Sequence, residues 1–137
     1  MSKKMESNDF LLSMLVGMAE SGASVGITIS VNGTLVTGNL ISQKKYVDEL
    51  VSNLRAPLES VFPEHSNSML ESFSRIGNMS NGSSGTEGES GEYEYIHLGE
   101  AQHFVGNSAI PSDGVLWRGK LTAIDGFILG RISFERD

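Results

Sequence analysis

The amino-acid sequence predicts an α+β fold: a small, strongly curved antiparallel sheet or partly closed barrel, with an N-terminal helix and further helices inserted between strands. Three observations support this prediction. Two strand-like segments carry Asn-Gly or Asp-Gly at their centres, which is a strong short-range signal for a hairpin. Other segments space their apolar residues as one face of a helix does. Glycine interrupts both predicted hairpins on the face that is otherwise apolar.

Size and charge limit the protein classes to consider. The chain of 137 residues, with a formal charge of −7 and no cysteine, fits a single domain over residues 1–137. The absence of cysteine removes disulfides and thiol chemistry and fits a reducing cytosol. The acidic balance argues against a general nucleic-acid binder, which needs a basic surface to release phosphate counterions.

The first predicted element is a helix over residues 9–21. Ser7 or Asn8 is expected to cap it and Gly22 to end it. Its apolar residues form a broad arc: Phe10, Leu11, Leu12, Met14, Leu15, Val16, Met18 and Ala19. Such an arc predicts burial against the domain, with contact to a second chain as the alternative. The apolar run is shorter than the ~20 residues that span a membrane, and acidic residues interrupt the basic start, so a cytosolic helix is favoured over a cleaved signal.

A hairpin and two helices follow. Asn32-Gly33 predicts a two-residue turn that pairs Ile27 with Gly38. Ser42 is expected to cap the next helix, and Pro57 to kink or end it. Its buried stripe is predicted to contain Tyr46, Val47, Leu50, Val51 and Leu54. A further short helix is expected over residues 66–76.

The segment 77–92 has a different composition. Gly, Ser, Asn and Glu dominate it, and such a segment buries too little apolar surface to offset the entropy of ordering. It is predicted to be an internal disordered linker. A passive spacer and a tether that tunes self-association are both open roles.

The remaining chain predicts a strand and a second hairpin. Residues 93–98 alternate as a strand, which residues 101–105 extend, and residues 107–114 are expected to form a loop. Asp125-Gly126 predicts the turn of a hairpin over residues 115–134, with Gly119 opposite Ile132. Gly38 and Gly119 would then both lie on the inward face as bend points of one curved sheet, with Sm-like or OB-like barrels as candidate topologies.

The sequence offers little catalytic or metal chemistry. His65, His97 and His103 lack the spacing of a ligand set and are predicted to be surface or rim residues. No nucleophile elbow, P-loop or dinucleotide fingerprint is present, so no enzyme activity, cofactor or metal is predicted. Residues of one predicted sheet face form a candidate surface for an anion or a protein partner, with an ordinary solvated strand face as the alternative: Leu116, Arg118, Lys120 and Arg131.

Several blocks in order resemble the gas vesicle accessory protein GvpU family. They are "VNGTLVTGNLISQKKYVDEL" at 31–50, "YIHL" at 95–98 and "LWRGKLTAIDGFILGRIS" at 116–133. The resemblance implies a non-enzymatic cytoplasmic accessory protein of gas vesicles, which are protein-shelled gas compartments in bacteria. It further implies self-association, vesicle clustering, and vesicles or their shell proteins as partners.

Two other functions remain open from the residues alone. The curved sheet with its basic face also suits an Sm-like or OB-like module that binds RNA, although Trp117 is predicted to face inward, where it cannot stack on bases. An enzyme whose site is assembled from distant residues is the third possibility, and the sequence names no residue for it.

Overall fold

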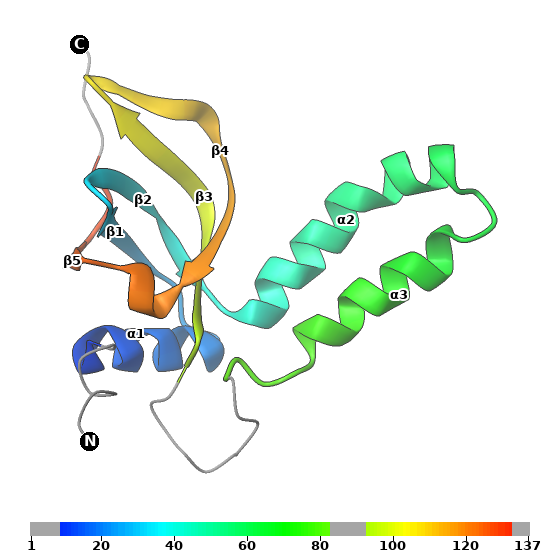
Figure 1. The fold of residues 1–137 in the computed structure, drawn as a ribbon, viewed down its shortest axis with the longest axis horizontal. Coiled ribbons are helices and arrows are strands. Elements are labelled where there is room, and N and C mark those ends of the chain that lie inside the picture. The colour runs from blue at the N-terminus through cyan, green and yellow to red at the C-terminus, as the bar shows by residue number, and fades with distance from the viewer. Residues whose placement is uncertain (1–8, 83–92, 133–137) are drawn as a thin grey trace.

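The computed structural model describes residues 9–82 and 93–132. Within them, five strands form one antiparallel sheet in the order β4-β3-β2-β1-β5, accompanied by three α-helices (Figure 1). The elements are α1 (Phe10–Glu20), β1 (Val25–Val31), β2 (Thr34–Ile41), α2 (Gln43–Val61), α3 (Ser66–Gly77), β3 (Tyr95–Val105), β4 (Ser108–Lys120) and β5 (Gly126–Leu129). The α+β prediction is confirmed. The sheet is not closed into a barrel, because β4 and β5 remain at its two edges.

The first hairpin is confirmed with its register. Ile27 pairs with Gly38 and Val31 with Thr34. Asn32 and Gly33 adopt φ angles of 55° and 86°, the positive values that a type I′ turn requires. The alternation of β1 and β2 therefore places their large aliphatic residues on one face of the sheet, except Leu35 and Ile41, which lie on the other face.

That face forms the main core together with α1. Asp9 caps α1 by accepting hydrogen bonds from the backbone N–H groups of Leu11 and Leu12. The predicted caps Ser7 and Asn8 lie outside the described residues. The buried apolar residues of this core come from α1, from β1 to β3 and from the turn after β4: Leu12, Val16, Ala19, Ile27, Ile29, Val36, Leu40, Ile96, Leu98, Ala101 and Leu121.

The predicted second hairpin over residues 115–134 is wrong. Residues 108–120 pair with β3 instead, so the segment 107–114, predicted to be a loop, contributes most of its residues to β4. β5 pairs with β1 at the opposite edge. The Asp125 carboxylate accepts a hydrogen bond from the Asn32 N–H at 2.8 Å, and the Asp125 N–H donates to the Ser30 carbonyl. Asp125 therefore fastens the start of β5 to the first hairpin and does not form a hairpin turn.

Both predicted inward glycines occupy crowded positions. A Cβ on Gly38 would lie 3.1 Å from the Gly99 carbonyl oxygen and 3.2 Å from the Ala101 Cα. β3 carries an irregularity in its pairing there, so Gly38 permits a close approach of two backbones. Gly119 pairs with Ile96, not with Ile132 as predicted, and a Cβ on it would lie 2.6 Å from the indole ring of Trp117.

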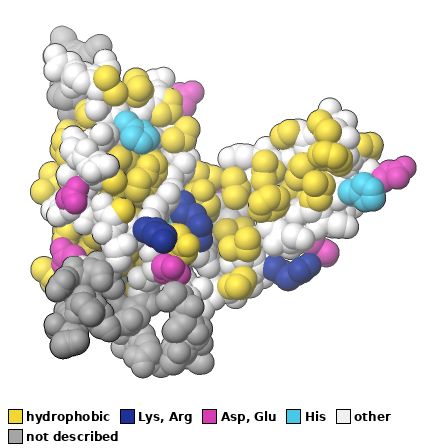
Figure 2. Space-filling model, in the orientation of Figure 1, with side chains coloured by type: hydrophobic (Ala, Val, Ile, Leu, Met, Phe, Trp, Pro, Cys, Tyr) yellow, Lys and Arg dark blue, Asp and Glu magenta, His cyan; other side chains and the backbone are white. Residues whose placement is uncertain are grey.

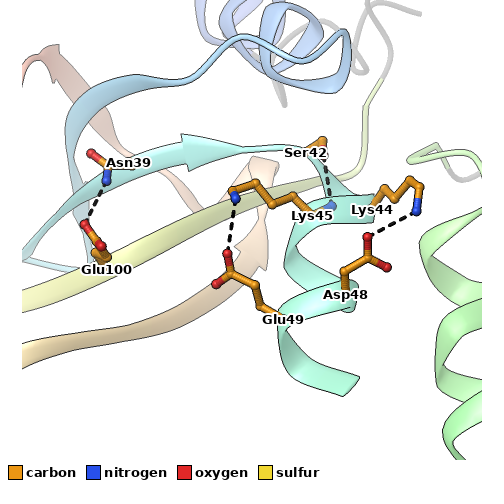
Figure 3. Close-up of polar contacts among 7 residues, drawn as sticks. All are labelled: Asn39, Ser42, Lys44, Lys45, Asp48, Glu49 and Glu100. Atoms are coloured by element: carbon orange, nitrogen blue, oxygen red, sulfur yellow. Dashed lines mark hydrogen bonds and ion pairs between the residues drawn. The ribbon is translucent and has the colours of Figure 1, made fainter. Parts of the chain in front are cut away.

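The two inserted helices form an arm, residues Gln43–Gly77, that extends away from the sheet (Figure 1). Ser42 caps α2 as predicted, by accepting a hydrogen bond from the Lys45 N–H at 3.0 Å (Figure 3). Pro57 does not end α2, which continues to Val61. The arm has its own small core of Val47, Val51 and Leu70.

The segment predicted to be a linker, 77–92, begins with ordered residues. Gly77 is the last residue of α3, and Asn81 is buried. The Asn81 side-chain amide donates to a Glu20 carboxylate oxygen and to the Tyr95 carbonyl, and its oxygen accepts from the Tyr95 N–H. Asn81 thereby joins α1 to the start of β3. The rest of this prediction, residues 83–92, lies outside the described residues.

Candidate interaction surface

The sheet face opposite α1 holds the predicted basic residues. Arg118 lies opposite His97 on β3, and Lys120 lies opposite Tyr95. Arg118 and Lys120 share this face because β4 pairs with β3, not because of the hairpin that was predicted for residues 115–134. Leu116 lies on the same strand and is partly buried.

Arg118 is engaged by its neighbours. Its guanidinium lies 3.8 Å from the centre of the Tyr95 ring, which is a cation–π contact. Its Nε–H donates to His97 Nε2 at 3.0 Å. An arginine held on both sides in this way is less available to an external anion than a free one.

His97 is buried, so its prediction as a surface or rim histidine is wrong. It is 1% exposed and lies 4.9 Å from the Tyr46 ring of α2, centre to centre. Because Nε2 accepts a hydrogen bond, the neutral ring carries its proton on Nδ1. Burial, and secondarily the positive charge of Arg118, lower the pKa of His97 from 6.5 to about 3. Near neutral pH His97 is therefore an uncharged residue that joins α2 to the sheet.

Arg131 reaches this face from the segment that follows β5. Its guanidinium donates to the Glu100 carbonyl at 2.8 Å and to the Gln102 side chain at 3.3 Å. The same segment crosses the sheet, where the Ile132 N–H donates to Thr37 Oγ1. Arg131 thus helps to fasten the chain after β5 across to β3.

These contacts weaken the case for the predicted partner surface, because they give its two arginines roles within the fold. Arg118 and Arg131 both hold neighbouring strands together, and Lys120 is exposed. A role of Leu116, Arg118, Lys120 and Arg131 in partner binding stays a prediction. The alternative was an ordinary solvated strand face. The contacts give a structural reason for the two arginines on such a face, because each arginine joins neighbouring segments.

The largest exposed apolar side chains of α1 lie on its outward side. Phe10, Leu11, Met14 and Met18 are 68%, 65%, 52% and 47% exposed, respectively. Leu12, Val16 and Ala19 on the opposite side are buried in the core. One half of the apolar arc is therefore buried against the domain, as predicted, and the other half is exposed, where the predicted alternative was contact with a second chain. The signal was present in the sequence, since an arc this broad exceeds what one sheet face covers.

The space between α1 and α2 forms a shallow pocket of about 480 Å³. Ala19, Ala23, Ile41, Ser42 and Lys44 are among its lining residues. The first N–H groups of α2 already have partners there, because Gln43 N–H donates to the Glu20 carboxylate and Lys45 N–H to Ser42. The pocket is therefore an open hollow beside a satisfied helix start.

Among residues 9–82 and 93–132, no three His, Cys, Asp or Glu side chains lie close enough to hold a metal ion. In the same part of the chain, none of the helices has the length and apolar character needed to cross a membrane.

Comparison with known proteins identifies the family. The family described as gas vesicle protein GvpU-like matches residues 9–132, which is nearly the whole chain. No curated protein and no solved structure matches. The chain therefore belongs to the GvpU-like family, and the resemblance expected from its sequence blocks is confirmed.

Proposed function

We propose that this member of the GvpU-like family is a non-enzymatic, cytoplasmic accessory protein that binds gas vesicles through protein–protein contacts and promotes their clustering by associating with itself. The family match supports the association with gas vesicles. The open apolar side of α1 supports binding to a protein surface, because contiguous exposed apolar residues mark interaction sites on otherwise polar proteins.

The outward side of α1 is the surface assigned to the vesicle shell. Leu11, Met14 and Met18 follow one another at helical spacing, and Phe10 lies one turn before Met14. Flexible methionine side chains adapt to a partner of irregular shape. The charged residues that normally cover the outer side of a surface helix are absent between Phe10 and Ala19.

The experiment is flotation with purified gas vesicles, which rise on centrifugation and carry bound protein with them. The wild-type chain is expected in the buoyant fraction. The Leu11→Gln/Met18→Gln variant, which keeps good helix formers, is expected to remain in the subnatant. Leu129→Gln is the matched control, because Leu129 on β5 is 64% exposed and Leu11 is 65% exposed.

Two results would contradict the proposal. A wild-type chain that stays entirely in the subnatant excludes vesicle binding. Equal flotation of wild type and the α1 variant excludes the assigned surface and leaves vesicle binding in place.

A further inference from the structure

The contacts between α2 and α3, and between the arm and the sheet, leave several apolar residues of the arm exposed or only partly buried. It stands away from the sheet as a single layer of two antiparallel helices (Figure 1). Only its base approaches the sheet, where Tyr46 packs on His97. A helix pair buries one side of each helix against the other and leaves the flanks of that contact open.

The apolar pattern of the arm is that of a helix bundle. Val47, Val51, Leu54, Leu58 and Val61 follow at alternating spacings of four and three residues along α2. In α3 the apolar Leu70 and Phe73 continue this spacing, and the small residues Ser66 and Gly77 occupy the next positions on either side. The small Gly77 brings the helices close, because a Cβ there would lie 3.0 Å from the Val47 Cβ.

Burial along this pattern is incomplete. Of the large apolar residues in the arm, Val47, Val51 and Leu70 are buried. Partly buried residues flank them along the arm: Tyr46, Leu50, Leu54, Leu58, Met69 and Phe73. Val61, Phe62 and Ile76 are 65%, 43% and 41% exposed. In Figure 2 hydrophobic side chains accordingly form a row along the arm on the face toward the viewer.

We infer that the arm binds the arm of a second copy of this chain, in antiparallel orientation, to form a four-helix bundle. Two helical hairpins are each half of the commonest small bundle, and a two-fold axis makes the same surface serve both partners. This inference names the surface for the self-association contained in the proposed function, and its test needs no vesicles.

The size of the arm suits a specific dimer. At a rise of ~1.5 Å per residue, α2 and α3 are about 28 Å and 18 Å long. Two such hairpins laid face to face would bury on the order of 1,000 Å² in total, which is near the lower limit for a specific interface. A dimer that depends on concentration is therefore expected.

Charges along the arm fit the antiparallel orientation. At the base, Lys44 pairs with Asp48 at 3.1 Å and Lys45 with Glu49 at 3.3 Å, so these four charges balance within α2 (Figure 3). Midway along the arm, Arg55 pairs with Glu59 at 4.0 Å within α2, and Glu71 lies near the middle of α3. The two ends differ in charge: Arg75 lies near the base, and Glu64 lies at the tip just before α3. Antiparallel arms bring each base toward the other copy's tip, which places these opposite charges near one another. A parallel pair would place like charges together.

The first experiment measures the mass of the full chain by sedimentation velocity over a concentration series. Wild type is expected to dimerise with a dissociation constant below roughly 100 µM, as an interface of this size allows. Leu50→Gln/Met69→Gln removes partly buried apolar side chains outside the arm's own buried cluster and is expected to weaken the dimer at least about tenfold. Leu35→Gln, which changes an exposed leucine on β2, is the control and is expected to dimerise as wild type does.

A second experiment keeps the inference testable should the Gln variant fail to fold. The chain has no cysteine, so single cysteines give clean cross-links. A short bismaleimide is expected to join Glu64→Cys to Arg75→Cys when the two variants are mixed, and to join neither variant efficiently to itself.

The inference is overturned by a wild-type chain that stays monomeric, by a dimer that the Gln variant leaves unchanged, or by self-linking of each cysteine variant in place of mixed linking. A monomer whose arm variant loses vesicle flotation would assign the arm to the vesicle. A dimer that fails to bind vesicles would contradict only the proposed function.

Discussion

At the scale of single residues, His97 shows how the tertiary context decides the role of a polar side chain. The sequence places it between Ile96 and Leu98 in an alternating strand, which indicates that it points away from the core. It does so, but Tyr46 and Arg118 cover it on that side. The sequence cannot predict this cover, because both neighbours are distant in the chain.

The lowered pKa of His97 predicts a pH dependence of stability. The pKa is 6.5 for an ordinary histidine and about 3 in the fold, so protons bind the unfolded chain more tightly. The contribution of His97 to stability is therefore complete above pH 6.5 and is lost as the pH falls from there toward 3, by up to ~1.4 kcal/mol per pH unit.

Urea unfolding of wild type and His97→Gln between pH 7.5 and pH 4.5, roughly the upper part of this window, measures the effect. Glutamine retains an acceptor for the Arg118 Nε–H but does not titrate. Its free energy of unfolding is expected to change less with pH than that of wild type. Parallel pH profiles of the free energy of unfolding for the two proteins would contradict a lowered pKa of His97 in the fold.

Gly119 gives a second prediction at this scale. Gly119→Val places a branched side chain where the Trp117 indole lies, and the ring has to move from its partly buried position. We expect a loss of about 1–3 kcal/mol in the free energy of unfolding. Because Trp117 is the only tryptophan, its emission in the folded state is expected to shift as well.

The matched control is Gly126→Ala, because a Cβ at that strand glycine meets no atom within 4 Å. It is expected to unfold at nearly the wild-type denaturant concentration. A Gly119→Val variant with unchanged stability and emission would show that the glycine makes no room for the indole.

At the scale of elements, local signals succeeded where the chain forms its contacts locally. The Asn32-Gly33 turn, its register and the capping of α2 by Ser42 follow from neighbouring residues alone. Asp125-Gly126 carries a similar signal, but the carboxylate of Asp125 binds the Asn32 N–H of the first hairpin. A long-range contact thus replaces the local turn, and β4 pairs with β3 instead.

Asn81 makes a second long-range contact, between α1 and the start of β3. The sequence does not predict it, because the surrounding residues are rich in glycine and serine and indicate a linker. Asn81→Ala removes a donor and an acceptor that hold Glu20 of α1 and the backbone of Tyr95. Because the Tyr95 groups stay partly buried, the loss is expected to be about 1–3 kcal/mol in the free energy of unfolding.

Thermal or urea unfolding of Asn81→Ala beside Asn78→Ala tests this role. Asn78 is exposed just after α3, so its truncation is expected to have little effect. Equal stability of the two variants would mean that Asn81 does not fasten these elements.

At the scale of the whole molecule, the fold class and the family could be predicted, but the distribution of surfaces could not. Helical and strand periodicities report which residues are apolar, and they do not report how much of an apolar arc the neighbouring elements cover. The three-dimensional arrangement shows that α1 keeps Leu11 and Met18 open and that the arm covers Leu50 only in part. The predicted basic surface, by contrast, contains two arginines that hold strands together.

The proposed activity needs two surfaces that act together, α1 for the vesicle and the arm for a second copy. Figure 1 shows α1 against the sheet and the arm extending away from it, so neither surface blocks the other. A chain that binds a vesicle on one side and a second chain on the other links vesicles in pairs and larger groups.

The most direct test is vesicle clustering, followed by light microscopy and dynamic light scattering, with flotation measured on the same samples. Wild type is expected to float with vesicles and to cluster them. Leu50→Gln/Met69→Gln is expected to float but leave vesicles dispersed, and Leu11→Gln/Met18→Gln to do neither. Clustering by the arm variant at the wild-type level, or flotation of the α1 variant, would contradict the account.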